Sequence, residues 1–95
     1  MPKSLQEILH RCSKPEKRVI RIIGLKSPEN LFVREFDIIT SRENYDIRAR
    51  KTALDWLVKV GILVSEGSGD SLQYKFSETV IQAGGPQWIM KQLVL

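Results

Sequence analysis

Apolar residues between positions 47 and 60 recur with the 3.6-residue period of a helix. Ile47, Leu54 and Leu57 fall, together with five further apolar residues, in one arc of roughly 200°. The opposite arc is polar and contains Arg48, Lys51, Thr52, Asp55 and Lys59. With Asp46 as a candidate N-cap, this pattern predicts a helix with one face that packs and one that meets water or a ligand.

Glycine and two short apolar runs follow this predicted helix. Gly61 stands where the helix should end, because glycine adopts the left-handed conformation of a C-terminal cap without a steric penalty. Residues 62–64 are aliphatic, residues 67–70 are Gly-Ser-Gly-Asp, and polar and apolar residues alternate over 71–76. The sequence therefore predicts a β-hairpin with its turn at 67–70.

Two shorter helices are predicted near the N-terminus. An apolar stripe indicates an amphipathic helix over residues 3–13. Ser13 and Glu16 have the spacing of a capping box, so a second helix should start just after Ser13. Gly24 is the natural end of that second helix.

The segment 27–46 has two interpretations that periodicity does not separate. In one, Leu31 and Phe32 form a short edge strand before a helix over 33–39. In the other, one uninterrupted helix runs over 28–39. The residues expected to point inward are Val33, Phe36 and either Ile38 or Ile39.

The C-terminal segment is unusually apolar. Gly84, Gly85 and Pro86 interrupt the preceding pattern, and a helix is predicted over 86–94. Its apolar density is too high for a free tail, so it should pack against the core or against a second subunit.

The stretch ALDWLVKVGIL followed by a short hairpin resembles the third helix and the wing of winged helix-turn-helix domains. In that superfamily the helix carries two leucines three apart, as Leu54 and Leu57 here, and soon reaches a glycine and an aliphatic strand. The resemblance covers residues 15–78. It implies an α+β, mainly α, fold: a winged helix-turn-helix core with extra N-terminal and C-terminal helices. Residues 1–95 then form a single domain, which is the size of one hydrophobic core.

Charge is distributed unevenly along the chain. The net charge of +4 favours an anionic partner. Residues 1–26 carry seven Lys/Arg against two Glu, and residues 47–60 carry four Lys/Arg against one Asp. Residues 27–46 carry two Arg against five acids, so the helix expected there is acidic.

The sequence offers no catalytic or metal-binding pattern. One cysteine and one histidine form neither an internal disulfide nor a four-ligand zinc site, and we expect Cys12 to be a buried apolar residue in a reducing compartment. His10 lies off the apolar stripe, two residues from Cys12, so the two side chains point apart. We therefore expect no enzyme, cofactor, metal or small-molecule substrate. Without a leader or an apolar span, we expect a cytoplasmic protein with no membrane partner.

The polar face of residues 47–60 is the candidate surface for reading double-stranded DNA. A helix fits the major groove, Arg bonds guanine edges, and Lys neutralises phosphates. The candidate nucleic-acid-binding residues are Arg42, Asn44, Tyr45, Arg48, Lys51, Thr52 and Lys59, with Lys17, Arg18 and Arg21 as further candidates for contacts to the DNA backbone. The expected role is a transcriptional regulator or an accessory factor in replication or mobile-element biology, with a homodimer formed through the terminal helices. A merely solvated helix face has the same composition.

A second class of function is a winged-helix module that binds protein within a larger assembly, without touching DNA. The predicted wing turn contains no Lys or Arg and is flanked by Glu66 and Asp70, so we expect it to add little phosphate affinity. The acidic helix expected over 33–39 and the apolar C-terminus also favour a protein partner. RNA binding is a third, smaller alternative.

Three side chains of the predicted helices call for separate interpretation. Arg50 falls inside the apolar arc, so its guanidinium should extend past the helix start towards Glu43 or Asp37, unless the helical phase is wrong. Trp56 and Trp88 occur at helical spacing among aliphatic residues, which favours packing in a core or interface over stacking on bases.

Overall fold

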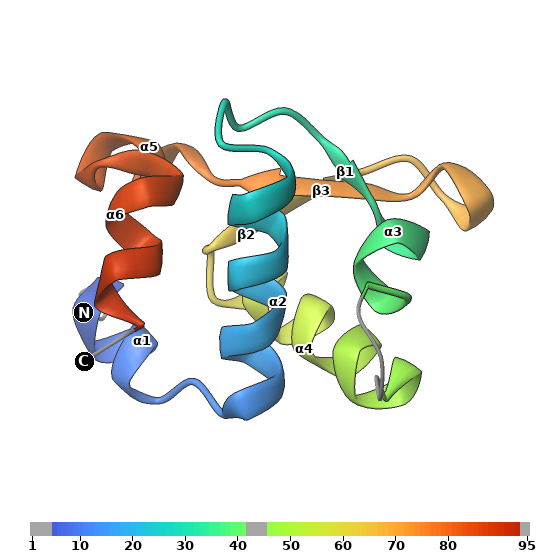
Figure 1. Cartoon of the computed structure of the whole chain (residues 1–95), viewed down its shortest axis with the longest axis horizontal. Helices are drawn as coiled ribbons and strands as arrows, with labels where there is room; N and C mark the ends of the chain where they lie inside the picture. The colour runs from blue at the N-terminus through green and yellow to red at the C-terminus, as the bar shows by residue number, and fades with distance from the viewer. Residues whose placement is uncertain (1–4, 42–45, 94–95) are drawn as a thin grey trace.

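The computed structural model describes residues 5–41 and 46–93, which form a mainly helical α+β structure. The elements run in the order α1 (Leu5–His10), α2 (Lys14–Lys26), β1 (Val33–Arg34), α3 (Glu35–Ile39), α4 (Ile47–Lys59), β2 (Leu63–Glu66), the 3₁₀ turn η1 (Gly69–Ser71), β3 (Gln73–Phe76), α5 (Glu78–Ala83) and α6 (Gly85–Gln92). Figure 1 shows the sheet along one side of the molecule, with α2, α3 and α4 below it.

The sheet is antiparallel, and its described strands lie in the order β1-β3-β2. Val33 lies opposite Tyr74, and Leu63 lies opposite Phe76. These four side chains are buried, so the period-2 alternation directs one face of the sheet to the core. The predicted hairpin is therefore confirmed.

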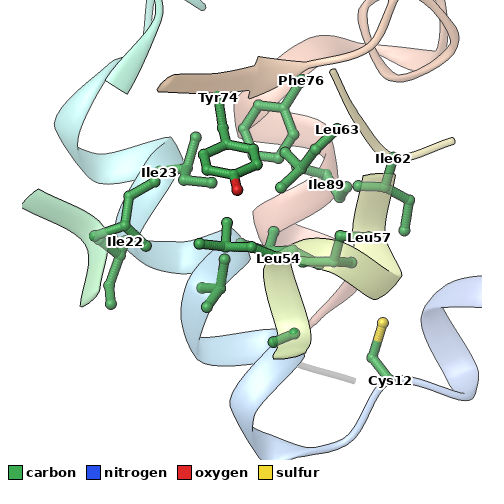
Figure 2. Packing of buried hydrophobic residues seen from close by; sticks show 14 of the residues in the cluster. Cys12, Ile22, Ile23, Leu54, Leu57, Ile62, Leu63, Tyr74, Phe76 and Ile89 are labelled. Atoms are coloured by element: carbon green, nitrogen blue, oxygen red, sulfur yellow. The ribbon is translucent and has the colours of Figure 1, made fainter. Parts of the chain in front are cut away.

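α2 lies at the centre of the hydrophobic core. Val19, Ile20 and Ile23 have no exposed surface, and α2 packs against α4 and α6. Figure 2 shows Leu54 and Leu57 of α4 beneath the inward side chains of the sheet. Each such buried aliphatic side chain contributes about 1.5–3 kcal/mol of transfer free energy.

The end of α2 differs from the prediction. The helix continues past Gly24 to Lys26, and Ser27 ends it by donating its N–H to the Ile23 carbonyl. A Cβ at Gly24 would lie 2.7 Å from the sulfur of Met90 in α6. Gly24 therefore permits a close approach of two helices instead of ending one.

The segment after α2 contains a strand, so the prediction of one helix over 28–39 is wrong. The edge strand lies at Val33–Arg34, two residues later than Leu31 and Phe32. Asn30 sets this position: with φ of 59°, it accepts a hydrogen bond from Phe76 N–H at 2.9 Å and donates one to the Phe76 carbonyl at 3.2 Å. Its side chain thus pairs with β3 before β1 begins.

α3 begins at Glu35 and buries both Ile38 and Ile39. Phe36 was expected to point inward but is 67% exposed. It lies two residues before Ile38, about 200° around the helix, so the face that packs on the core excludes it. Ile39, about 60° around the helix from Phe36 on its other side, is buried, so Phe36 lies at the border of the packed face and its predicted burial is wrong.

The remaining predicted elements are confirmed with small shifts. Asp46 caps α4 by accepting the Ala49 N–H at 3.1 Å. Gly61 follows α4 with φ of 87°, as a left-handed cap requires. Ile47 was assigned to the packing arc but is 41% exposed, because it is the first residue of the helix and lies at the border of that arc.

The C-terminal helix packs on its own chain. α6 begins at Gly85, one residue before the predicted start, and a further short helix, α5, precedes it. Ile89 is fully buried and Leu93 is 7% exposed, and α6 contacts α2. The most buried apolar residues of α6 therefore belong to the core of the chain itself.

Candidate nucleic-acid interface

α4 presents the polar face that the sequence predicts. Its buried residues are Arg50, Ala53, Leu54 and Leu57. The predicted contacts Arg48, Lys51, Thr52 and Lys59 are all exposed, and so is Asp55. Arg42, Asn44 and Tyr45, the other predicted contacts, lie outside the described residues.

Arg50 holds α4 against α3. Its side chain is only 2% exposed, so the predicted helical phase is confirmed. Its guanidinium Nη1 donates to the Ile38 carbonyl at 2.9 Å and to the Ser41 carbonyl at 2.6 Å. A cation at the carbonyl end of α3 also interacts favourably with the negative end of that helix dipole. Of the partners predicted for Arg50, Glu43 lies outside the part of the chain that the structure describes.

A tyrosine and two carboxylates lie beside α4. The Tyr74 hydroxyl, which belongs to a 3% exposed side chain, donates to Glu35 Oε2 at 3.3 Å. Burial raises the pKa of Tyr74 far above its usual value, and the negative charges of Glu35 and Asp55 raise it further. The carboxylates of α3 and α4 thus act together on this buried hydroxyl, and they reduce the positive potential next to the polar face of α4.

A shallow groove runs between α3, the start of α4 and the hairpin turn. Its described lining residues are Arg34, Glu35, Phe36, Asp37, Ile39, Lys51, Gly69, Asp70 and Leu72. Three carboxylates therefore face two cations around an exposed aromatic ring. Lys51, a predicted DNA contact, lies at the border between this groove and the polar face of α4.

The basic residues of α2 form a separate surface. Lys14, Lys17, Arg18 and Arg21 line one hollow together with Ile22. α2 and α4 pack against each other through their buried sides, and the described lining of this hollow comes from α2 alone. The structure thus brings the predicted backbone contacts Lys17, Arg18 and Arg21 together with one another but not with Arg48, Thr52 and Lys59.

Cysteine, histidine and the two tryptophans lie where the sequence predicted structural or solvent-exposed residues. Cys12 is 7% exposed, as expected of a buried apolar residue. The pKa of the Cys12 thiol is raised to about 11, first by burial and then by the negative charge of Glu16, while Lys17 acts to lower it. His10 is exposed, and Trp56 and Trp88 are partly buried against the core, as predicted.

The described residues contain no group of three His, Cys, Asp or Glu that would hold a metal ion. None of the helices in the described ranges has the length and apolarity needed to cross a membrane. Two features of the structure did not follow from the sequence pattern: the exposure of Phe36 and the pairing of Asn30 with β3. For Asn30, the tendency of asparagine to adopt a positive φ was the one available signal. Comparisons with family models, with curated proteins and with solved structures find no match for this chain.

Proposed function

We propose that this chain is a winged helix-turn-helix domain that binds double-stranded DNA, with α4 in the major groove. The observation that carries the proposal is the exposed polar face of α4, with Arg48, Thr52 and Lys59 directed away from the core. The order of elements from α2 to β3 and the strand order β1-β3-β2 support a winged arrangement, in which the hairpin is the wing. A regulator of transcription, or an accessory factor in replication or mobile-element biology, would use such a domain in the cytoplasm.

Each side chain of this face has a distinct role in the proposal. Arg48, in the first turn of α4, would bond a guanine edge, and Thr52 one turn later would contact a base or a methyl group. Lys51 and Lys59 would neutralise phosphates. Asp55 repels phosphates but accepts a hydrogen bond from a cytosine amine, so it would select against other bases at its position. Arg50 fixes the angle of α4 to α3 and so orients all of these groups.

The test is a fluorescence-anisotropy titration of labelled duplex DNA at about 50 and 200 mM salt, where counterion release shows itself. We expect affinity to fall at least tenfold across this range. Arg48→Ala should weaken binding and relax base preference, which corresponds to about 1–3 kcal/mol at one position. Lys59→Ala should weaken binding evenly across sequences and reduce the salt slope by about 1.

Lys91→Ala is the matched control, because Lys91 is an exposed cation on α6 and its loss should leave binding unchanged. The assignment of the polar face of α4 as the DNA contact would be refuted if the wild-type chain and the three variants bound DNA with equal affinity. These variants are Arg48→Ala, Lys51→Ala and Lys59→Ala. Absence of binding at 50 mM salt would refute DNA binding itself.

A second candidate function is a winged-helix module that binds protein without direct DNA contact. Phe36, at 67% exposed in an acidic groove, favours this candidate, because large exposed aromatic side chains are typical of protein interfaces. Exposed Glu66 and Asp70 on the hairpin would repel a DNA backbone. An apolar interface responds weakly to salt, so the same titration separates the two candidates.

A further inference from the structure

Two surfaces of the chain have opposite charge: one lies on α2, and the other borders the proposed DNA contact at Lys51. The first is the basic face of α2, formed by Lys14, Lys17, Arg18 and Arg21. The second is the acidic groove between α3 and the hairpin turn, described above. Each surface also carries one large exposed apolar side chain, Leu25 at the end of α2 and Phe36 in the groove.

The basic face of α2 is a continuous stripe. Lys14, Arg18, Arg21 and Leu25 are spaced by four, three and four residues, which places them one above another on a helix. The stripe is about 16 Å long at 1.5 Å per residue. It ends at Leu25, which is 58% exposed although it belongs to a helix whose other aliphatic residues are buried.

The acidic groove offers the complementary chemistry. Phe36 stands 67% exposed with Asp37 beside it on α3, and Asp70 projects from the hairpin turn on the other side of the groove. Lys51 and Arg34 also line the groove, but the carboxylates outnumber them. Arg18 and Arg21 on α2 and Asp37 and Asp70 in the groove are all exposed, so these opposite charges are accessible to another molecule.

We propose that the acidic groove of one copy receives the basic face of α2 from a second copy. Arg18 and Arg21 would face Asp37 and Asp70, and Leu25 would pack near Phe36. Because the two surfaces differ and lie on separate elements, this contact is heterologous and joins copies head to tail. The contact uses none of Arg48, Thr52 and Lys59, although Lys51 of the proposed DNA face also lines the groove. The proposed self-association goes beyond the proposed DNA binding and does not rest on it.

The test uses sedimentation velocity of the whole chain without DNA, at 50 mM salt and increasing protein concentration. We expect the mean mass of the wild-type chain to rise above the monomer mass of 10.9 kDa and to pass that of a dimer as concentration grows. Raising the salt to about 500 mM should return it to monomer, because screening removes attraction between exposed charges.

Two variants disable one surface each. Arg18→Ser with Arg21→Ser removes the basic face, and Phe36→Ser with Asp37→Asn removes the groove. All four residues are exposed, so both variants should fold, which circular dichroism checks. Each variant alone should stay monomeric. Mixed together, they keep one intact basic face and one intact groove, so they should form a 1:1 dimer and nothing larger.

Lys59→Ser with Lys91→Ser is the control that removes the same charge from other faces, and it should associate as the wild-type chain does. The proposal is refuted if the wild-type chain stays monomeric up to about 1 mM, a concentration well above the dissociation constants of specific interfaces. The groove would then bind another protein or none. If either variant still associates, the contact is not made by these two surfaces and the proposal is refuted. A mixture that stays monomeric, or that grows beyond a dimer, refutes the head-to-tail arrangement.

Discussion

Arg50 is the charged residue on which the candidate interface depends most directly. It is almost fully buried in a helix face that otherwise carries Ala53, Leu54 and Leu57. Its guanidinium donates to the carbonyl of Ile38, which also accepts the Ser41 N–H at 3.4 Å, and to the carbonyl of Ser41, just past the end of α3. One side chain of α4 therefore joins that helix to the C-terminal end of α3.

Arg50→Met should destabilise the chain by about 3 kcal/mol, because the buried Ile38 carbonyl and the partly buried Ser41 carbonyl lose a charge-assisted donor. The free energy of unfolding of Arg50→Lys should lie between those of the wild-type chain and Arg50→Met, since an ammonium lacks the planar fork of guanidinium. Urea unfolding followed by circular dichroism measures the difference. Arg48→Met is the matched control, because an exposed arginine two residues away should change the free energy of unfolding by less than about 0.5 kcal/mol. Equal stability of the two Met variants would show that Arg50 does not hold α3.

At the scale of elements, the contact between α2 and α6 places the C-terminal helix against its own chain. Gly24 lacks the side chain that would hold these helices apart, and Met90 occupies the space instead. Glycine within a helix costs about 1 kcal/mol relative to alanine, so close packing must offset that cost. The helix that was expected to pair two subunits is thereby docked on its own chain.

Gly24→Ala should couple strongly to Met90. In the wild-type background, the gain in helix propensity is offset because the new Cβ meets the Met90 side chain, at 2.7 Å from its sulfur. In a Met90→Ala background, Gly24→Ala should stabilise by about 1 kcal/mol. A double-mutant cycle from urea unfolding gives the coupling, and the exposed Lys91→Ala background should show none. The same effect of Gly24→Ala in all three backgrounds would contradict this account of α2 and α6.

At the scale of the whole molecule, folding buries two groups that ionise in alkaline solution. The pKa of Cys12 rises from 9.0 to about 11 in the folded chain, and that of Tyr74 rises well above its ordinary 10.0. Above pH 9 the unfolded chain therefore loses these protons first. When the unfolded state binds fewer protons than the folded state, the free energy of unfolding falls as pH rises.

We expect stability to be constant with respect to these two groups below pH 8 and to fall between pH 9 and pH 11. Urea unfolding at a series of pH values measures the slope. Cys12→Ala and Tyr74→Phe should each flatten it, and the double variant should flatten it most, whatever their stability at neutral pH. An unchanged alkaline slope in the double variant would show that other groups cause the fall.

The sequence by itself determined the local parts of this protein. Periodicity and caps located α4, its polar face, its N-cap at Asp46 and its glycine end, because each depends on residues within a few positions of one another. The hairpin followed from the same short-range rules, whereas the mainly helical α+β class was what the resemblance of residues 15–78 implied.

Only the tertiary structure decided what depends on residues far apart. Gly24 is a contact and not an end because Met90, distant in sequence, lies against it. Asn30 delays β1 because it pairs with Phe76, and Phe36 is left exposed because it lies at the border of the packed face of α3. α2 and α4 pack through their buried sides, and α2 alone provides the described lining of its basic hollow, a relation that composition along the chain does not contain.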